Sequence, residues 1–200
     1  MGTGGDGDGV GTGVTGMGWG VTPLPEVARA LTFQDYGRGP ELEGVYHRPL
    51  RKHRALEGWF MEYLRVTGGR AETDVGVPGD FEVRQVSFSY AAPGRLNAFH
   101  LHPRERQDEL WCVVDGLLAV WLVDVREGSP TAGLRRRYIL SGEEPALLHI
   151  PSGVAHGYRA GPAGALLVYA VTSQFDPVHP NEARLPWDHF GAGLWEDDRG

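Results

Sequence analysis

Short β-rich runs separated by Gly, Pro and Asp recur along the chain beyond Leu42, at intervals of about ten residues. This spacing is typical of a β-sandwich or barrel. We expect eight main strands, at residues 59–66, 81–90, 98–102, 109–115, 117–125, 135–140, 146–150 and 165–172. Because no helical periodicity separates them, the pattern predicts an all-β fold, a jelly-roll barrel that closes on itself.

Two of the expected strands differ in the faces that they bury. Val86, Phe88 and Tyr90 alternate with serines, which predicts one buried apolar face and one face in water. Residues 165–171 are apolar throughout, so we expect sheet on one face and a partner subunit on the other. Between the fourth and fifth strands, Asp115-Gly116 predicts a tight hairpin.

The first residues have a different composition. Residues 1–22 are mostly Gly with Asp, Thr and Val, too polar to bury a core, so we expect a flexible tail there. A short helix is expected from Pro23 to Ala30, with Pro25 in its first turn. Residues 23–200 are predicted to form one domain, because 200 residues with 41% hydrophobic content suffice for one core.

Charge and cysteine content exclude several classes of partner. The net charge is −7 and no basic run is longer than Arg135-Arg136-Arg137, so we expect neither nucleic acid nor an anionic membrane as partner. The single cysteine, Cys112, lies in an apolar run and is expected to be buried and unreactive. Because no stretch resembles a signal peptide or a membrane span, we expect a cytoplasmic protein.

The clearest chemical motif, G-x5-H-x-H-x6-E-x6-G followed by P-x-G-x2-H, contains His100, His102, Glu109 and His156. It resembles the two-part site of the cupins. The first two histidines are two residues apart on a strand, so they point into the same space. Three imidazoles and a carboxylate suit a divalent transition metal such as Fe, Mn, Ni, Cu or Zn. Glu105 could supply the carboxylate instead, because it stands at the more usual cupin spacing.

A second set of motifs is typical of a particular family. These motifs are Val123-Asp124-Val125-Arg126-x-Gly128-Ser129-Pro130-Thr131-x-Gly133, Ile150-Pro151-x-Gly153-x-Ala155-His156-Gly157, Gly58-Trp59-Phe60-x-Glu62 and Trp187-Asp188. Through them the chain resembles the dTDP-4-dehydrorhamnose 3,5-epimerases. The resemblance implies a homodimeric cupin jelly roll, a double-stranded β-helix, that moves protons at carbons next to a ketone without a metal.

The resemblance also implies roles for single residues. His100 stands where the family has its general base, and Tyr169 stands where it has its acid. An imidazole can remove a proton next to a carbonyl, and a phenol can deliver one to the opposite face. Glu62, Asn97 and Phe175 stand at positions that are implied to contact the substrate.

Several positions depart from the family's pattern. Glu57, Asn97 and Glu109 stand where the family has two arginines and a lysine that would neutralise a diphosphate. Phe175 replaces a second active-site tyrosine, and the family's S-x-K-D segment, whose aspartate orients the histidine, has no match in this sequence. Because a carboxylate beside a phosphate is repulsive, we expect a standard dTDP-sugar to be a poor ligand.

These observations support three hypotheses. The first is a carbohydrate epimerase or isomerase with His100 as base and Tyr169 as acid, without a cofactor, acting on a smaller sugar or keto acid. The alternative is a metal-dependent cupin, a dioxygenase or isomerase that holds Fe, Mn, Ni or Zn through His100, His102, His156 and a glutamate. A further alternative is a non-catalytic sugar-binding cupin. In each case we expect a small-molecule ligand and a homodimer.

Overall fold

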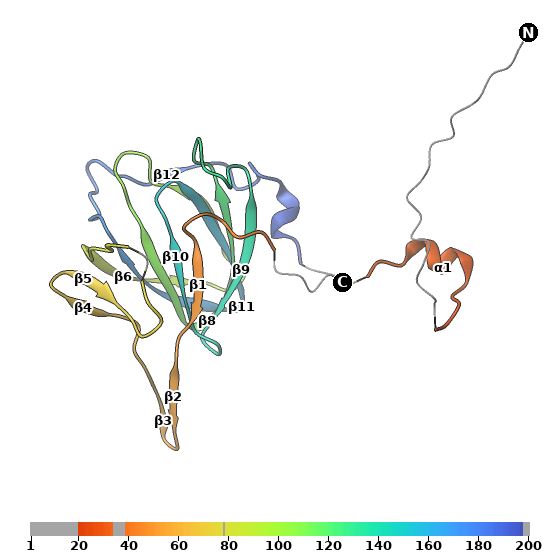
Figure 1. Cartoon of the computed structure of the whole chain (residues 1–200), viewed down its shortest axis with the longest axis horizontal. Helices are drawn as coiled ribbons and strands as arrows, with labels where there is room; N and C mark the ends of the chain where they lie inside the picture. Colours follow the sequence, from red (N-terminus) through yellow and green to blue (C-terminus); the bar gives the residue numbers. More distant parts are fainter. Residues whose placement is uncertain (1–19, 34–38, 78, 198–200) are drawn as a thin grey trace, which may run out of the picture. The chain divides into compact units, whose positions relative to one another are not determined.

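The computed structural model describes residues 20–33, 39–77 and 79–197 (Figure 1). The chain divides into two units, Met1–Arg38 and Gly39–Gly200. The first unit contains the helix α1, Pro25–Ala30, which begins at proline because the first turn needs no N–H donor. The flexible tail predicted for residues 1–22 falls almost wholly outside the described residues. The domain start predicted at residue 23 stays a prediction.

The second unit consists mainly of β-strands, as the all-β prediction requires. Eight strands join in one hydrogen-bonded sheet: β1 (Tyr46–Pro49), β6 (Gln85–Ala91), β7 (Leu96–Leu101), β8 (Glu109–Asp124), β9 (Arg135–Ser141), β10 (Ala146–Ile150), β11 (Val154–Val171) and β12 (Ala183–Arg184). Two hairpins precede β6, namely β2–β3 (Lys52–Ala55, Gly58–Met61) and β4–β5 (Arg65–Thr67, Arg70–Glu72). A short 3-10 helix, η1 (Ala192–Trp195), follows β12. The predicted cupin jelly roll is confirmed.

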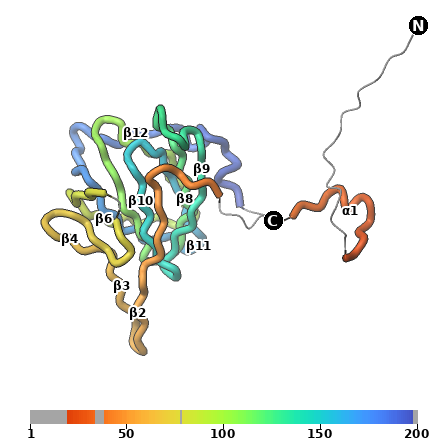
Figure 2. The backbone as a smooth tube through the Cα atoms, in the orientation of Figure 1, coloured from red at the N-terminus to blue at the C-terminus, as the bar shows by residue number. Residues whose placement is uncertain are grey.

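The long strands β8 and β11 belong to both halves of the barrel (Figure 2). Residues 109–116 of β8 pair with 165–171 of β11, and residues 118–124 pair with 154–160. The first half of the barrel has the order β1-β10-β8-β11-β6, and the second has the order β9-β8-β11-β7-β12. The jelly roll therefore has two sheets that share two strands.

The hairpin predicted at Asp115-Gly116 is wrong, because β8 runs through both residues. Gly116 has a φ of 73° and Gly164 on β11 has a φ of 76°, and the register between the strands shifts just before Ala165. A Cβ at Gly116 would overlap the carbonyl oxygen of Gly164. Positive φ at this close approach bends the strand from one sheet into the other and does not reverse it.

The main core lies between the two sheets. Leu118, Val120 and Leu140 come from the second sheet, and Trp111 and Leu167 come from the first. All five are at most 4% exposed. Burial of such apolar side chains is the dominant favourable term in folding, and here it fixes one sheet against the other.

A second apolar layer covers the outer face of the first sheet. Val168 packs there with Cys112 and Phe81. The prediction that residues 165–171 are buried on both faces is confirmed, but the outer cover comes from residues 50–83 of the same chain and not from a partner. Cys112 is fully buried, and burial raises the pKa of its thiol to about 12.

The two faces of strand β6 are reversed relative to the prediction, because its apolar side chains are the exposed ones. Val86, Phe88 and Tyr90 are 49%, 69% and 63% exposed, whereas Ser87 and Ser89 on the other face are partly buried. The reason is that β6 ends its sheet and its inner face borders a polar cavity, which Ser89 lines. An apolar stripe on an edge strand is typical of a surface that another molecule covers.

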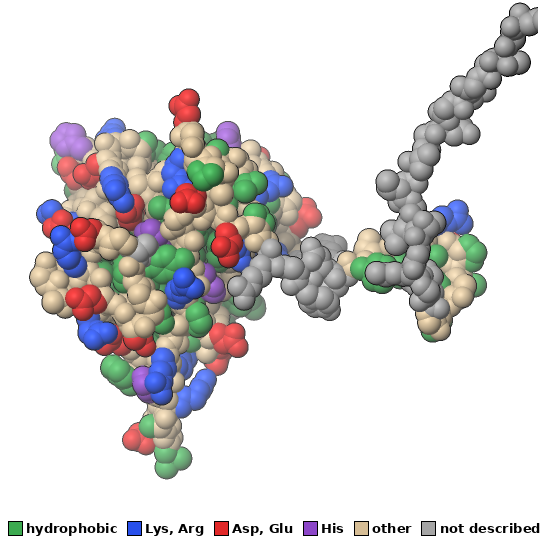
Figure 3. All heavy atoms as spheres, viewed as in Figure 1, with side chains coloured by type: hydrophobic (Ala, Val, Ile, Leu, Met, Phe, Trp, Pro, Cys, Tyr) green, Lys and Arg blue, Asp and Glu red, His purple; other side chains and the backbone are tan. Residues whose placement is uncertain are grey.

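The surface carries charges of both signs. Figure 3 shows acidic and basic side chains interspersed over the visible face of the β-rich unit, without a continuous basic patch on that face. The expected absence of a nucleic-acid partner stays a prediction. Among the described residues, no helix is long and apolar enough to cross a membrane. The cytoplasmic location stays a prediction.

Candidate active site

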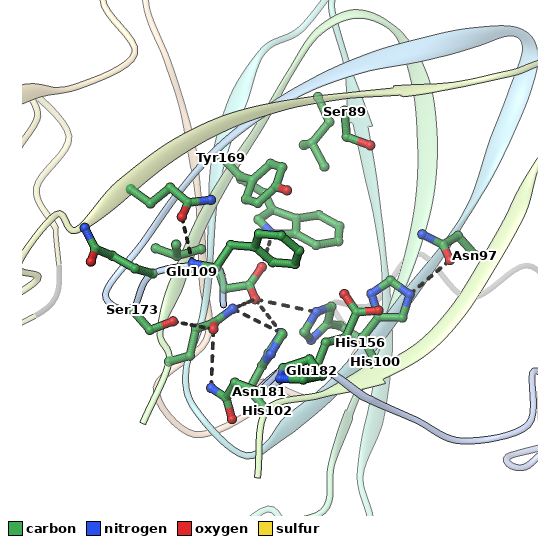
Figure 4. A pocket seen from close by; sticks show the side chains of 18 of the residues that line it. Ser89, Asn97, His100, His102, Glu109, His156, Tyr169, Ser173, Asn181 and Glu182 are labelled. Carbon is green, nitrogen blue, oxygen red and sulfur yellow. Dashed lines mark hydrogen bonds and ion pairs between the residues drawn. The ribbon is translucent and has the colours of Figure 1, made fainter. Parts of the chain in front are cut away.

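A cavity of about 240 Å³ is lined by both sheets and by the loop that follows β11 (Figure 4). Its volume lies just below the range of about 300–1,000 Å³ that is usual for small-molecule sites. Alternate side chains of β8 (Glu109, Trp111) and of each half of β11 line it, as the strand geometry requires. Strand β7 contributes Asn97 and His100, three residues apart, where its register with β11 shifts. The cavity brings together His100, His102, Glu109, His156, Asn97, Tyr169 and Phe175.

Three imidazoles form one side of the cavity. His100 on β7 pairs across the strands with His156 on β11, and their ring centroids are 5.6 Å apart. His102 follows β7, and its ring stacks on His156 at 5.5 Å. The expectation that the two histidines of the H-x-H motif share one space therefore agrees with the structure.

Glu109 lies beside these rings and is only 4% exposed. Its Oε1 accepts hydrogen bonds from His102 Nε2 and Gln107 Nε2, each at 2.8 Å, and its Oε2 accepts one from Trp111 Nε1. Burial alone would raise the pKa of the carboxyl, but the charge of His156 and the bonds from His102 and Trp111 lower it to about 2. Glu109 is therefore a carboxylate at neutral pH.

A metal ion could be held by three of these groups. His102, Glu109 and His156 each offer one ligand atom, and these atoms lie within 4.8 Å of one another. His100 is outside this group of three. Glu105 does not line the cavity; its backbone N–H bonds to Asn181 near the protein surface. Of the two glutamates, Glu109 is the one that lies with the histidines, and its role as a metal ligand stays a prediction.

His100 is held by a neutral amide. Its Nε2 lies 3.0 Å from Oδ1 of Asn97, and Arg184 donates to the same oxygen. Burial, followed by the neighbouring His156, lowers the pKa of His100 to about 4. The ring is therefore neutral near pH 7 and can accept a proton.

Tyr169 lines the cavity from the opposite sheet. It belongs to the half of β11 that pairs with β6, whereas His100 is on β7 in the other sheet. Burial raises the pKa of the Tyr169 phenol, although a hydrogen bond with Ser87 opposes this effect. At neutral pH the phenol keeps its proton and can donate it.

The two remaining predicted contact residues differ in position. Phe175 lines the cavity rim, 74% exposed, and its backbone N–H donates to Gln85. Glu62 does not line the cavity and forms an exposed ion pair with Arg65. It follows β3, and its neighbours Tyr63 and Leu64 pack against the outer apolar layer.

Several cavity residues are outside the set predicted from sequence. They include Gln107, Trp111, Tyr158, Asn181, Glu182 and Arg184. Gln107 is central among them, because its side-chain oxygen accepts bonds from Ser173 and Asn181 while its nitrogen donates to Glu109. A signal was available for some: Gln107, Glu109 and Trp111 share one parity along the chain, and alternate residues of a strand share a face.

Comparisons with known proteins agree with this architecture. The sequence profile of the dTDP-4-dehydrorhamnose 3,5-epimerases matches residues 40–194. The spore coat polysaccharide biosynthesis protein SpsL of Bacillus subtilis is 38% identical over 154 residues, which are 76% of this chain and 95% of that protein. The probable low-salt glycan biosynthesis epimerase Agl13 of Haloferax volcanii is 29% identical over 150 residues, 74% of this chain and 90% of that protein.

A solved structure gives the same picture. The crystal structure of an epimerase, RmlC from Legionella pneumophila, in complex with dTDP-4-keto-L-rhamnose, superposes with a TM-score of 0.65 and 26% identity. The superposition covers 80% of this chain and 80% of that one. The superposition therefore supports the cupin barrel as the fold of this chain.

Proposed function

Because this chain belongs to the dTDP-4-dehydrorhamnose 3,5-epimerase family, we propose that it is a carbohydrate epimerase that inverts carbons next to a ketone, with His100 as base and Tyr169 as acid. Removal of a proton next to a carbonyl gives an enolate, and return of a proton to the other face of that carbon inverts it. Neither step requires a cofactor.

The observation that carries this proposal is the position of the two groups in opposite sheets around one cavity. A sugar ring bound between them has a neutral imidazole on one face and a protonated phenol on the other. That is the arrangement that inversion requires. The low pKa of His100, about 4 through burial and the nearby His156, keeps its lone pair free at neutral pH.

The charge of the cavity limits the substrate. Glu109, Asp176 and Glu182 line it, and Arg184 is its one guanidinium among the described residues. Arg184 is already paired with Glu182 at 2.6 Å. We therefore propose a neutral keto sugar as substrate. A diphosphate or an anionic keto acid would meet the carboxylates of Glu109 and Asp176, and the one arginine of the cavity is already paired.

The other two hypotheses receive less support. The relatives are named as epimerases or polysaccharide biosynthesis proteins, which favours sugar chemistry over a metal-dependent dioxygenase. A non-catalytic sugar-binding protein would not require an imidazole and a phenol on facing sheets. For assembly we propose a homodimer, with Val86, Phe88 and Tyr90 of β6 in the interface.

The test is solvent deuterium exchange. A 4-keto-6-deoxyhexose is incubated with the protein in deuterated water, once free and once linked to dTDP, and deuterium at the carbons flanking the ketone is followed by mass spectrometry and NMR. We expect incorporation into the free sugar above the rate in buffer. Exchange no faster than in buffer for both forms would contradict the epimerase function.

A further inference from the structure

The amide of Asn97 has one possible orientation. Nη1 of Arg184 lies 2.9 Å from Oδ1 of Asn97. A guanidinium only donates hydrogen bonds, so the atom facing it must be the amide oxygen. On the other side of the amide, Nδ2 donates to the hydroxyl oxygen of Tyr158 at 3.3 Å. Arg184 is itself held by Glu182, so the amide is fixed at both ends.

The same oxygen determines the tautomer of His100. Oδ1 of Asn97 lies 3.0 Å from Nε2 of His100. Because an amide oxygen only accepts, Nε2 must carry the hydrogen, and a neutral imidazole then has its lone pair on Nδ1. Among the described residues, the only buried side-chain nitrogen or oxygen without a hydrogen-bond partner is Nδ1 of His102. Nδ1 of His100 is not such an atom. The free nitrogen of His100 is thus accessible in a ring that lines the cavity.

We propose that Asn97 is a positioning residue that holds His100 as the Nε2–H tautomer, so that Nδ1 is the atom that takes the proton from the substrate. Only the last clause rests on the proposed function. Asn97 stands where the family has an arginine. Its contact with His100 orients the ring, a role that an aspartate of the S-x-K-D segment has in the family and for which this sequence has no match. An amide orients the ring without adding a negative charge that would stabilise the imidazolium.

The tautomer can be read without a substrate. In protein labelled with ¹⁵N-histidine, long-range ¹H–¹⁵N spectra distinguish a protonated ring nitrogen from a bare one, and the His100 signals are assigned by their loss in His100→Gln. We expect a protonated Nε2 and a bare Nδ1 in the wild-type protein. A protonated Nδ1, or signals averaged between the two tautomers, would overturn the proposal.

Variants separate positioning from mere structure. Asn97→Ala should give averaged His100 signals, and Asn97→Asp, which keeps an acceptor, should retain a protonated Nε2 at about pH 9, where imidazole is neutral. Asn181→Ala is the matched control, because it removes an amide from the same cavity that does not contact His100. Unchanged His100 signals in Asn97→Ala would refute the role of Asn97.

An activity measurement then distinguishes this inference from the function on which it partly rests. Asn97→Ala should lower kcat for deuterium exchange about tenfold to a hundredfold, with a smaller change in KM, because a misoriented base reacts less often. If the wild-type protein exchanges no sugar proton but shows the Nε2–H tautomer, the proposed function fails and the positioning by Asn97 stands. If it exchanges protons while the spectra show the other tautomer, the reverse holds.

Discussion

Nε2 of His102 lies 2.8 Å from Oε1 of Glu109, and each of these side chains is at least nine-tenths buried. The pair belongs to a hydrogen-bonded group in which Gln107 and Trp111 also donate to Glu109. Among the described residues, no lysine or arginine bonds to Glu109, and its ion-pair partners are the imidazoles of His102 and His156. The stability of this part of the barrel should therefore depend on the charge of one carboxylate.

Replacing Glu109 by glutamine should destabilise the protein by about 1–3 kcal/mol, because the charge-assisted bonds from His102 and Trp111 weaken while both donors stay buried. Urea unfolding followed by tryptophan fluorescence measures this change. Glu105→Gln, an exposed position outside the cavity, should stay within about 0.5 kcal/mol of wild type. Equal stability of the two variants would mean that the buried network contributes nothing.

We expect dTDP to bind with a dissociation constant weaker than about 0.1 mM. The cavity presents Glu109, Asp176 and Glu182 to a diphosphate, and its arginine, Arg184, is paired. Isothermal titration calorimetry at physiological salt checks this expectation, with free 4-keto-6-deoxyhexose as the comparison ligand. Micromolar binding of dTDP would show that arginines outside the cavity neutralise the phosphates.

The protein should be a dimer of about 44 kDa, twice the chain mass of 21.9 kDa. Light scattering at micromolar concentration measures this mass. Phe88→Asp should give a monomer, because Phe88 is 69% exposed in the stripe on β6. Ile139→Asp places the same charge on an exposed apolar residue of β9 and should stay dimeric. A monomeric wild-type protein would contradict the proposed assembly.

His100→Ala and His102→Ala should have different effects. His100→Ala should abolish deuterium exchange and leave stability within about 1–2 kcal/mol, because its ring contributes little to the core. His102→Ala should lower stability by about 3 kcal/mol or more, because it removes the imidazole that bonds to the buried carboxylate of Glu109 and leaves an empty space beside it.

Elemental analysis of the same preparations, purified without a chelating tag, tests the metal alternative. A stoichiometric transition metal in the wild type that is lost in His102→Ala would favour a metal-dependent cupin. We expect metal far below one ion per chain in the wild type and in both variants.

Asp124 gives the protein a stability that acid removes. It is fully buried, pairs with Arg126, and accepts bonds from Ser129 and Thr131, which lower the pKa of its carboxyl despite burial. A carboxyl with a depressed folded-state pKa stabilises the fold above its unfolded pKa, near 3.8, and loses this contribution as pH falls toward the folded value.

Asp124→Asn should therefore cost about 3–5 kcal/mol at about pH 7 and distinctly less at about pH 3. Urea unfolding of both proteins at the two values measures the difference. Asp176→Asn, an exposed carboxyl, serves as the control and should give a small effect. A cost that is the same at both pH values would show that shape, and not charge, is what Asp124 contributes.

Periodicity in the sequence was sufficient to predict the fold class and the sharing of one space by His100 and His102. It failed at Asp115-Gly116, because the dipeptide that favours a hairpin also supplies the positive φ of a bent strand. It failed at β6 because alternation shows that two faces differ but not which one meets the core. Val86 and Ser87 were therefore assigned to the wrong sides.

The candidate site was predictable in its titratable groups and less so in its neutral ones. His100, Glu109 and Tyr169 are recognisable by type and spacing. The amide of Asn97 bonds directly to His100, but the orientation that presents its oxygen is fixed by Arg184, 87 residues further along the chain. Contacts across such separations depend on strand register. The register of β12 against β7 brings Arg184 opposite His100, and sequence pattern alone does not specify it.

Because β8 and β11 each run through both sheets, the two walls of the cavity are linked by unbroken backbone. Spreading these walls to admit a larger ligand would require breaking the pairing of both strands, β8 and β11, at once. The distance between the imidazole on one wall and the phenol on the other is therefore a property of the scaffold, insensitive to changes at the rim. Loop residues such as those after β11 can differ and alter which sugar enters, while the separation of the two proposed proton-transfer groups stays set by the strands.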